Sequence, residues 1–247
     1  MIERPFPIAY LAARAPRTLR VRASLQDGSA PDEATFARQG LPMQSFAEVA
    51  ALGGFAGEKL PPLQSSATLV ELPRPGASEM EWAFTQVSVD AGALFVIENL
   101  LHQLHLQGHL LSRVTIETDL VPRGAAVPQV LPFVYEPLPF EYSYESIEAD
   151  VLIELEFAEP QEEPARRSFE QAYRSWLYLA ASGGFAEEPF LPGEMSIFPA
   201  DEPVSYPTGL EIYLEDVAIS DQGFDALVNM YHVLHYRTAK LRSLIIH

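Results

Sequence analysis

The stretch Gly53-Gly54-Phe55-Ala56 returns 130 residues later as Gly183-Gly184-Phe185-Ala186, and this repetition decides how the chain is built. The same offset holds on both sides of the turn. It relates Ser45 to Ser175, Ala50 to Ala180, Glu81 to Glu211, Asn99 to Asn229, Leu111 to Leu241 and Ile116 to Ile246. One register kept over about seventy residues predicts an internal duplication.

Each copy is predicted to contain the element order β-α-β-β-α-β. The first strand, residues 19–25, alternates polar and apolar residues, and its counterpart is residues 151–157. Each following helix ends at the Gly-Gly pair. The expected elements of the first copy are strand 19–25, helix 42–52, strands 67–72 and 81–89, a helix from Asp90 to about 106, and strand 112–117. Their counterparts are 151–157, 166–181, 195–198, 210–219, a helix from Ser220 to about 236, and 241–247.

This order predicts an α+β fold that is a tandem duplication of a ferredoxin-like unit. Each copy would have a four-stranded antiparallel sheet with two helices on one face. Residues 5–13 and 135–144 are expected to add an edge segment. The architecture generally resembles tandem ferredoxin-like proteins and α+β barrels, but no family motif accompanies it, so the resemblance implies no activity.

The domain organisation follows from the repeat. We expect a first repeat over residues 1–117, a linker over 118–134 and a second repeat over 135–247. Pro122, Pro128 and Pro132 make the linker extended and semi-stiff.

Composition excludes several classes of protein. The 247 residues include no cysteine, which excludes disulfides, thiolate metal sites and a cysteine nucleophile. No apolar run is long enough to span a bilayer, and the start of the chain is not typical of a secretory signal. We therefore expect a cytoplasmic protein that does not bind membranes.

Charge is strongly negative and unevenly placed. The net charge is −18. Residues 1–117 carry 9 Lys and Arg against 12 Asp and Glu, whereas residues 135–247 carry 6 against 21. This balance argues against a nucleic-acid partner, because phosphates need a basic surface. It favours a non-catalytic binding protein, such as an inhibitor or immunity-type protein, whose acidic second half attracts a basic protein.

A second repeated motif, Asn-x-x-His-x-x-His, marks the candidate binding residues. It comprises Asn99, His102 and His105 in the first copy and Asn229, His232 and His235 in the second. Histidines three apart on a helix are neighbours, and two such helices would offer four nitrogens to a divalent transition metal such as zinc. The favoured alternative is that the histidines flank an apolar stripe and make structural hydrogen bonds.

The remaining motifs favour structure over catalysis. The Gly-Gly turns are best interpreted as helix caps, and an anion cradle is the weaker alternative. Nucleophile-elbow, zinc-protease and dinucleotide-binding patterns are absent from the sequence, so we lean against an enzyme. A small-molecule site in the cleft between the copies is a third hypothesis for function.

The two copies are expected to meet through their open sheet faces. In the first strand Arg20 and Arg22 alternate away from the apolar positions, and Asp150 and Glu154 do so in the second copy. Position 20 is basic where position 150 is acidic. We therefore predict that these charges pair at an interface between the two sheets.

Overall fold

In the computed structural model the described residues are 4–26, 33–56, 66–71, 79–87, 91–108, 111–119, 133–145, 150–186, 198–199, 202–217 and 219–247. Most of the predicted linker, residues 120–132, lies outside them, as do Asp90 and the start of the strand expected from residue 195.

The first half forms one five-stranded sheet and two helices. Its elements are β1 (Ile8–Ala12), β2 (Thr18–Leu25), α1 (Glu33–Ala51), β3 (Thr68–Glu71), β4 (Glu79–Thr85), α2 (Ala91–Leu106) and β5 (Leu111–Thr118). The sheet order is β1-β5-β2-β4-β3. Alternate side chains of β2, namely Leu19, Val21 and Ala23, are fully buried under the helices.

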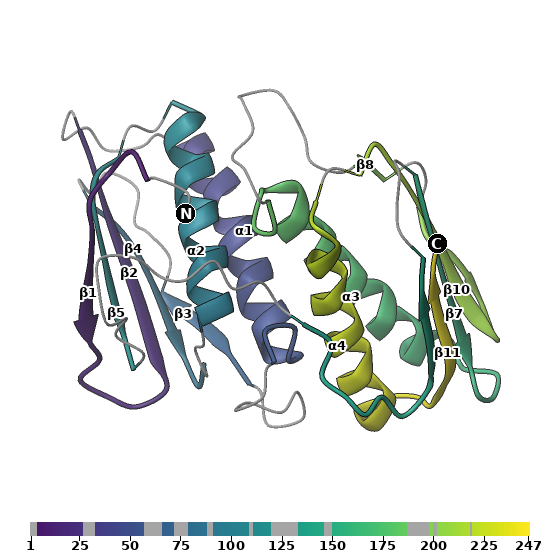
Figure 1. The fold of residues 1–247 in the computed structure, drawn as a ribbon. Helices are drawn as coiled ribbons and strands as arrows, with labels where there is room; N and C mark the ends of the chain where they lie inside the picture. The colour runs from purple at the N-terminus through teal and green to yellow at the C-terminus, as the bar shows by residue number, and fades with distance from the viewer. Residues whose placement is uncertain are drawn as a thin grey trace.

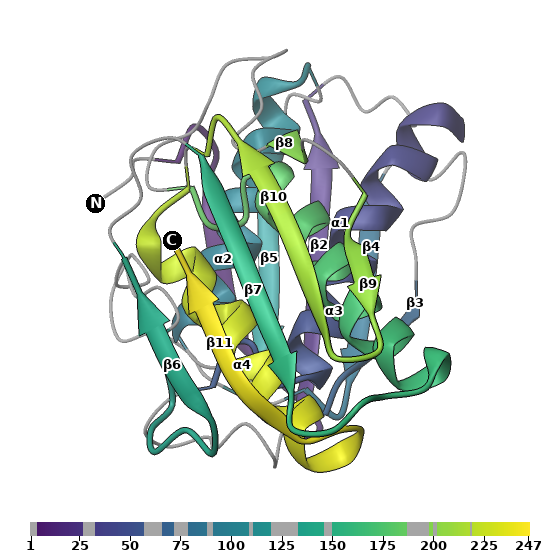
Figure 2. The same ribbon diagram turned by 90° about the vertical axis from the view of Figure 1, so that its right-hand side faces the viewer.

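The second half repeats this arrangement. Its elements are β6 (Glu141–Tyr144), β7 (Val151–Phe157), α3 (Glu163–Ala181), β8 (Phe198–Pro199), β9 (Val204–Tyr206), β10 (Gly209–Glu215), α4 (Asp221–Arg237) and β11 (Leu241–Ile246). The sheet order is β6-β11-β7-β10-β8, and β9 also pairs with β10. Figure 2 shows this sheet face-on, with β6 at one edge and β9 at the other.

The α+β class and the two similar halves agree with the sequence prediction, but the four-stranded antiparallel sheet does not. In each half the segment before the first predicted strand adds an edge strand, and that strand runs parallel to the last strand of the same half. The sheets are therefore mixed. The helix predicted from Pro42 begins earlier, at Glu33, and contains the proline, which removes only one backbone donor.

The molecule has four layers, with the helices of both halves between the two sheets (Figure 1). Helix α1 packs against α3 and also touches α4. Buried apolar side chains of the two halves form one continuous cluster. Within the described residues, none of the helices is long and apolar enough to cross a membrane.

This layering contradicts the predicted interface between the two sheets. The four residues assigned to it lie on the outward-facing surfaces of the two sheets: Arg20, Arg22, Asp150 and Glu154. The physical reason lies in α2, whose residues from Leu94 to Leu104 are buried all round. A helix that is buried on every side needs cover on both sides, so α2 lies between a sheet and the other half.

Candidate functional site: a buried polar cluster and an acidic sheet face

The two repeated motifs meet across the interface between the halves. Asn99 donates from Nδ2 to the carbonyls of Gly184, at 3.1 Å, and Ala186, at 3.0 Å. In return, Asn229 donates from Nδ2 to the carbonyl of Gly54 at 3.5 Å. Each asparagine therefore donates hydrogen bonds to the Gly-Gly turn of the other half. We call this pair of contacts the reciprocal clasp.

The turns have the shape that the clasp needs because of their glycines. Gly53 and Gly183 have φ angles of 75° and 79°, which L side chains rarely adopt. The next amide, that of Gly54, donates back to Val49 O at 2.9 Å, and Gly184 does the same to Leu179 O. These bonds close the helix ends in the Schellman pattern, so the capping interpretation accounts for the motif.

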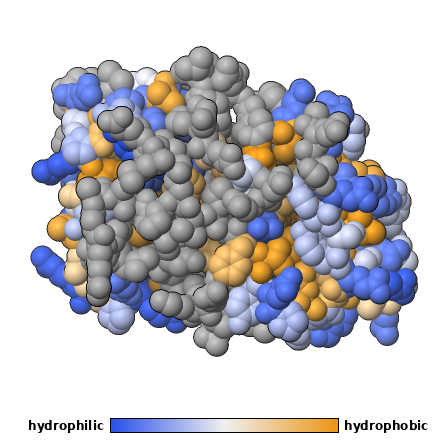
Figure 3. Space-filling model, viewed as in Figure 1, coloured by the Kyte–Doolittle hydropathy of each residue, from blue (hydrophilic) through white to orange (hydrophobic). Residues whose placement is uncertain are grey.

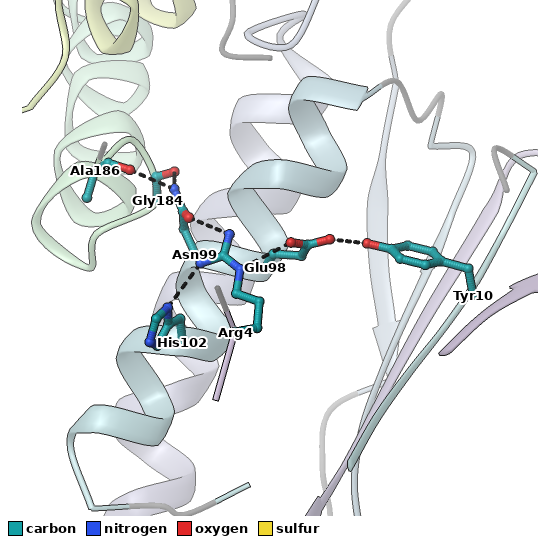
Figure 4. Close-up of polar contacts among 7 residues, drawn as sticks. All are labelled: Arg4, Tyr10, Glu98, Asn99, His102, Gly184 and Ala186. Atoms are coloured by element: carbon teal, nitrogen blue, oxygen red, sulfur yellow. Dashed lines mark hydrogen bonds and ion pairs between the residues drawn. The ribbon is translucent and has the colours of Figure 1, made fainter. Parts of the chain in front are cut away.

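In the first half Asn99 belongs to a larger polar cluster (Figure 4). Arg4 donates from Nε to Glu98 at 3.1 Å, from Nη2 to Asn99 Oδ1 at 2.8 Å, and from Nη1 to Nδ1 of His102 at 3.1 Å. Tyr10, on β1, donates its hydroxyl to the other oxygen of Glu98. A chain of polar contacts thus runs from the first sheet to the turn of the second half.

Burial sets the charge states of this cluster. The side chains of Arg4 and Glu98 are only 8% and 9% exposed. Burial, followed by the positive charge of Arg4 and by His105, lowers the pKa of His102 to about 4, so the ring is neutral at pH 7 and accepts from Arg4. Burial and the Glu98 carboxylate raise the pKa of Tyr10, which remains a donor. The cluster is therefore one buried ion pair with neutral neighbours.

The second half replaces this cluster with backbone groups. Asn229 accepts from the Tyr135 amide at 2.8 Å and donates to Phe133 O at 2.8 Å. The position that matches Glu98 is Val228, which is fully buried. The clasp is thus kept in both halves, but within the described residues only the first half attaches an ion pair to it.

The second histidine of each motif has a structural role. Nδ1 of His105 accepts from the Leu111 amide at 2.9 Å, and Nδ1 of His235 accepts from the Leu241 amide at 3.0 Å. Each bond joins the end of a helix to the start of the strand that follows. These contacts support the alternative in which the histidines are structural.

The predicted metal site is not assembled. All four motif histidines are among the described residues, and no three His, Asp or Glu side chains in that part of the chain lie close enough together to hold a metal ion. In addition, His102 lies beside the guanidinium of Arg4, which would repel a cation. The placement of His102, His105, His232 and His235 therefore gives the zinc hypothesis no support.

Strand register shows which positions on the outer faces match. Val21 pairs with Trp82, and Ile153 pairs with Ile212. Trp82 and Ile212 occupy matching positions at an offset of 130, so their partners Val21 and Ile153 also match. The offset between β2 and β7 is therefore 132. Seven residues separate β2 from α1 and five separate β7 from α3, and this difference of two accounts for the change of offset. The predicted match of position 20 with position 150 is therefore wrong by two residues.

The outer face of the first sheet is balanced by pairs within the sheet. Arg20 contacts Glu81 at 3.1 Å, and Arg22 contacts Glu81 at 3.4 Å and Glu117 at 4.0 Å. All of these side chains are partly exposed, so each pair contributes little to stability. Together they leave this face with both signs of charge interspersed.

The outer face of the second sheet is acidic. Its carboxylates are Glu154 and Glu156 on β7, Glu211 and Glu215 on β10, and Glu141 on β6. Arg242 contacts Glu156 at 3.6 Å and His247 contacts Glu154 at 3.0 Å. Asp150 accepts from the Tyr213 hydroxyl at 3.3 Å. In Figure 3 hydrophilic side chains lie along both the left-hand and the right-hand edges of the molecule, where the two sheets are.

Comparisons with known proteins identify no family. No family model and no curated protein matches the chain. Solved structures include a conserved protein from Enterococcus faecalis V583, 7% identical, with a TM-score of 0.20 over 97% of this chain and 95% of that chain. The ferredoxin protease FusC in complex with Arabidopsis ferredoxin is 9% identical, with a TM-score of 0.22 over 92% of this chain and 34% of that chain.

Chlorite dismutase from Candidatus Nitrospira defluvii is 11% identical, with a TM-score of 0.17 over 93% of this chain and 87% of that chain. These scores are too low to carry an argument about the fold or function of this chain.

Proposed function

We propose that the protein is a non-catalytic binding protein, of the inhibitor or immunity type, that holds a basic protein partner against the outer face of its second sheet. The buried cluster around Arg4 joins the two halves and has little access to solvent. The outer faces of the sheets, in contrast, are open, and they differ from each other in charge.

One cross-strand pair carries the proposal. In the first sheet Arg22 lies directly opposite Glu81, and the opposite charges attract. At the matching place in the second sheet Glu154 lies directly opposite Glu211, and the two carboxylates repel. A basic partner would relieve this repulsion on binding.

The wider charge distribution supports the same partner. Residues 135–247 have a net charge of −15, against −3 for residues 1–117. A surface of one sign raises the rate at which an oppositely charged protein arrives, and it disfavours partners of like charge. Exposed Tyr206 and Tyr213 on the same sheet add aromatic area, which is typical of protein interfaces.

The test compares two variants of equal net charge. The first removes three carboxylates from the second sheet, as Glu154→Gln, Glu156→Gln and Glu211→Gln. The second removes three from the first sheet, as Glu79→Gln, Glu81→Gln and Glu117→Gln. Binding of lysozyme, a small and strongly basic protein, is measured by calorimetry at low and at physiological ionic strength.

We expect lysozyme to bind wild type and the first-sheet variant with similar affinity, and the second-sheet variant at least tenfold more weakly. Binding should weaken as salt is added. An equal loss in both variants would mean that only net charge matters, and no binding to wild type at low salt would likewise overturn the proposal. The hypothesis of a small-molecule site between the halves stays a prediction.

A further inference from the structure

Tyr213 is an unusual side chain on the outer face of the second sheet. The residue is 42% exposed, and it lies within β10 between Glu211 and Glu215, whose side chains share the same face. Its hydroxyl donates to Asp150, which ties the ring to the neighbouring strand. The ring is therefore held in place while much of it remains open.

The first sheet shows what the matching position does. There the residue that matches Tyr213 is Ala83, and Arg20 lies directly opposite it on β2. The Arg20 guanidinium binds Glu81, the residue that matches Glu211. The first half thus contains its own guanidinium beside this carboxylate.

The second sheet has lost that guanidinium and kept its acceptor. Leu152 lies opposite Tyr213, in the place of Arg20. Among the described residues no cation pairs with Glu211, and the side chain directly opposite is another carboxylate, Glu154, which contacts the ring of His247 at 3.0 Å. An aromatic ring has been added where the first half has only a methyl group.

We propose that Tyr213, Glu211 and Glu154 form a binding site for an arginine side chain of the basic partner, which takes the place that Arg20 has in the first half. This inference rests on the proposed function and names the group that is recognised. A guanidinium suits the site better than an ammonium, because its planar fork matches a carboxylate while its face stacks on an aromatic ring.

The first test exchanges the cation. Two peptides of equal length and charge, Gly-Ser-Arg and Gly-Ser-Lys repeats, are titrated into the full chain at low ionic strength. The arginine peptide is expected to bind more tightly to wild type. Tyr213→Ala should weaken the arginine peptide about two- to fivefold, and Tyr213→Phe should not. Tyr178→Ala, a change of an exposed tyrosine on α3, is the control and should have no effect.

The second test supplies the missing arginine from within the chain. Leu152→Arg should occupy the site as Arg20 does and weaken the arginine peptide at least fivefold. Thr115→Arg adds the same charge to the first sheet and should leave binding within twofold of wild type. Circular dichroism and the unfolding midpoint show whether each variant is folded.

The outcomes separate the two proposals. If the triple glutamine variant of the second sheet binds both peptides as wild type does, the proposed function fails. If that variant loses binding but Tyr213→Ala and Leu152→Arg do not, the arginine site is overturned. It is also overturned if the arginine and lysine peptides bind equally. In both cases the proposal that the acidic face binds a basic partner still stands.

Discussion

The two halves differ least where they touch each other and most where they face outward. Asn99 and Asn229 each donate to the turn of the opposite half, Asn99 through two bonds and Asn229 through one longer bond. Asn99 is fixed by the guanidinium of Arg4, and Asn229 by the backbone amide of Tyr135. On the outer faces, Arg22 lies opposite Glu81 in the first sheet, whereas at the matching positions of the second sheet Glu154 lies opposite Glu211. A side chain at the contact between the halves must fit its partner, so few residue types are accepted there. A side chain on an open sheet face has no such partner, and more residue types are accepted.

The largest effect should come from breaking the buried ion pair of Arg4 and Glu98 in the first half. Arg4→Met leaves Glu98 buried without its cation, and removing one member of a buried pair costs about 3–5 kcal/mol. The free energy of unfolding is measured with urea. Arg14→Met, a change of an exposed arginine, is the control, and an equal loss in both variants would contradict the importance of the buried pair.

The next prediction converts the first half to the chemistry of the second. Glu98→Val copies Val228, so adding it to Arg4→Met should recover part of the lost stability, because no buried charge is then unpaired. About 1 kcal/mol or more should stay missing, since Asn99 and His102 still lack their Arg4 donor and the Tyr10 hydroxyl loses its Glu98 acceptor. If the double variant is no more stable than Arg4→Met, the second half does not show what position 98 accepts in the absence of a cation.

The clasp itself should respond similarly from both sides. Asn99→Ala leaves the carbonyls of Gly184 and Ala186 without their donor, and Asn229→Ala does the same to Gly54 O and Phe133 O. Each change should destabilise the protein by about 1–3 kcal/mol. Urea unfolding of the two single variants tests this, and a loss on one side only would show that the clasp is not reciprocal.

A smaller effect is expected from acid. The folded-state pKa of His102 is lowered to about 4, so the unfolded chain binds more protons below the ordinary pKa of 6.5. Stability from this group is therefore lost as pH falls, by about 2 kcal/mol between pH 6.5 and pH 4.5. His102→Gln should flatten the dependence of the urea midpoint on pH over that range. An unchanged slope would assign the dependence to other groups.

Much of the architecture could be predicted from the sequence, because in a duplicated chain the same pattern of apolar, glycine and polar residues occurs twice. Helix ends at Gly53 and Gly183 follow from backbone sterics that a short motif contains. Strand β7 lies where the alternation of residues 151–157 places it. The parallel pairing of β1 with β5 joins segments about a hundred residues apart, and local pattern does not specify such contacts.

The site was only partly predictable, because its contacts also join segments that are far apart in the sequence. The repeated Asn99 and Asn229 pointed to important positions, but their partners are backbone carbonyls of the other half, which leave no side-chain signal. Arg4 and Tyr10 have no counterpart in the repeat pattern and were missed. Glu98, a lone carboxylate in an apolar helix, was the available sign that a buried cation must be nearby.

The predicted interface between the two sheets was wrong for a physical reason. Charged residues on alternate strand positions predict partners across the sheets, yet Arg20 and Arg22 pair with Glu81 within their own sheet. The high apolar content of α2, from Leu94 to Leu104, is the better guide to which layer lies inside.

The central claim is that the changed outer face of the second sheet is the binding surface, and mapping the contact tests it most directly. Backbone amide signals of the labelled full chain are followed by NMR while the arginine peptide is added. The account predicts that the largest shifts fall on β7, β10 and β11, with β2, β4 and β5 unaffected. Shifts that concentrate on the first sheet, or spread evenly over the chain, would contradict it.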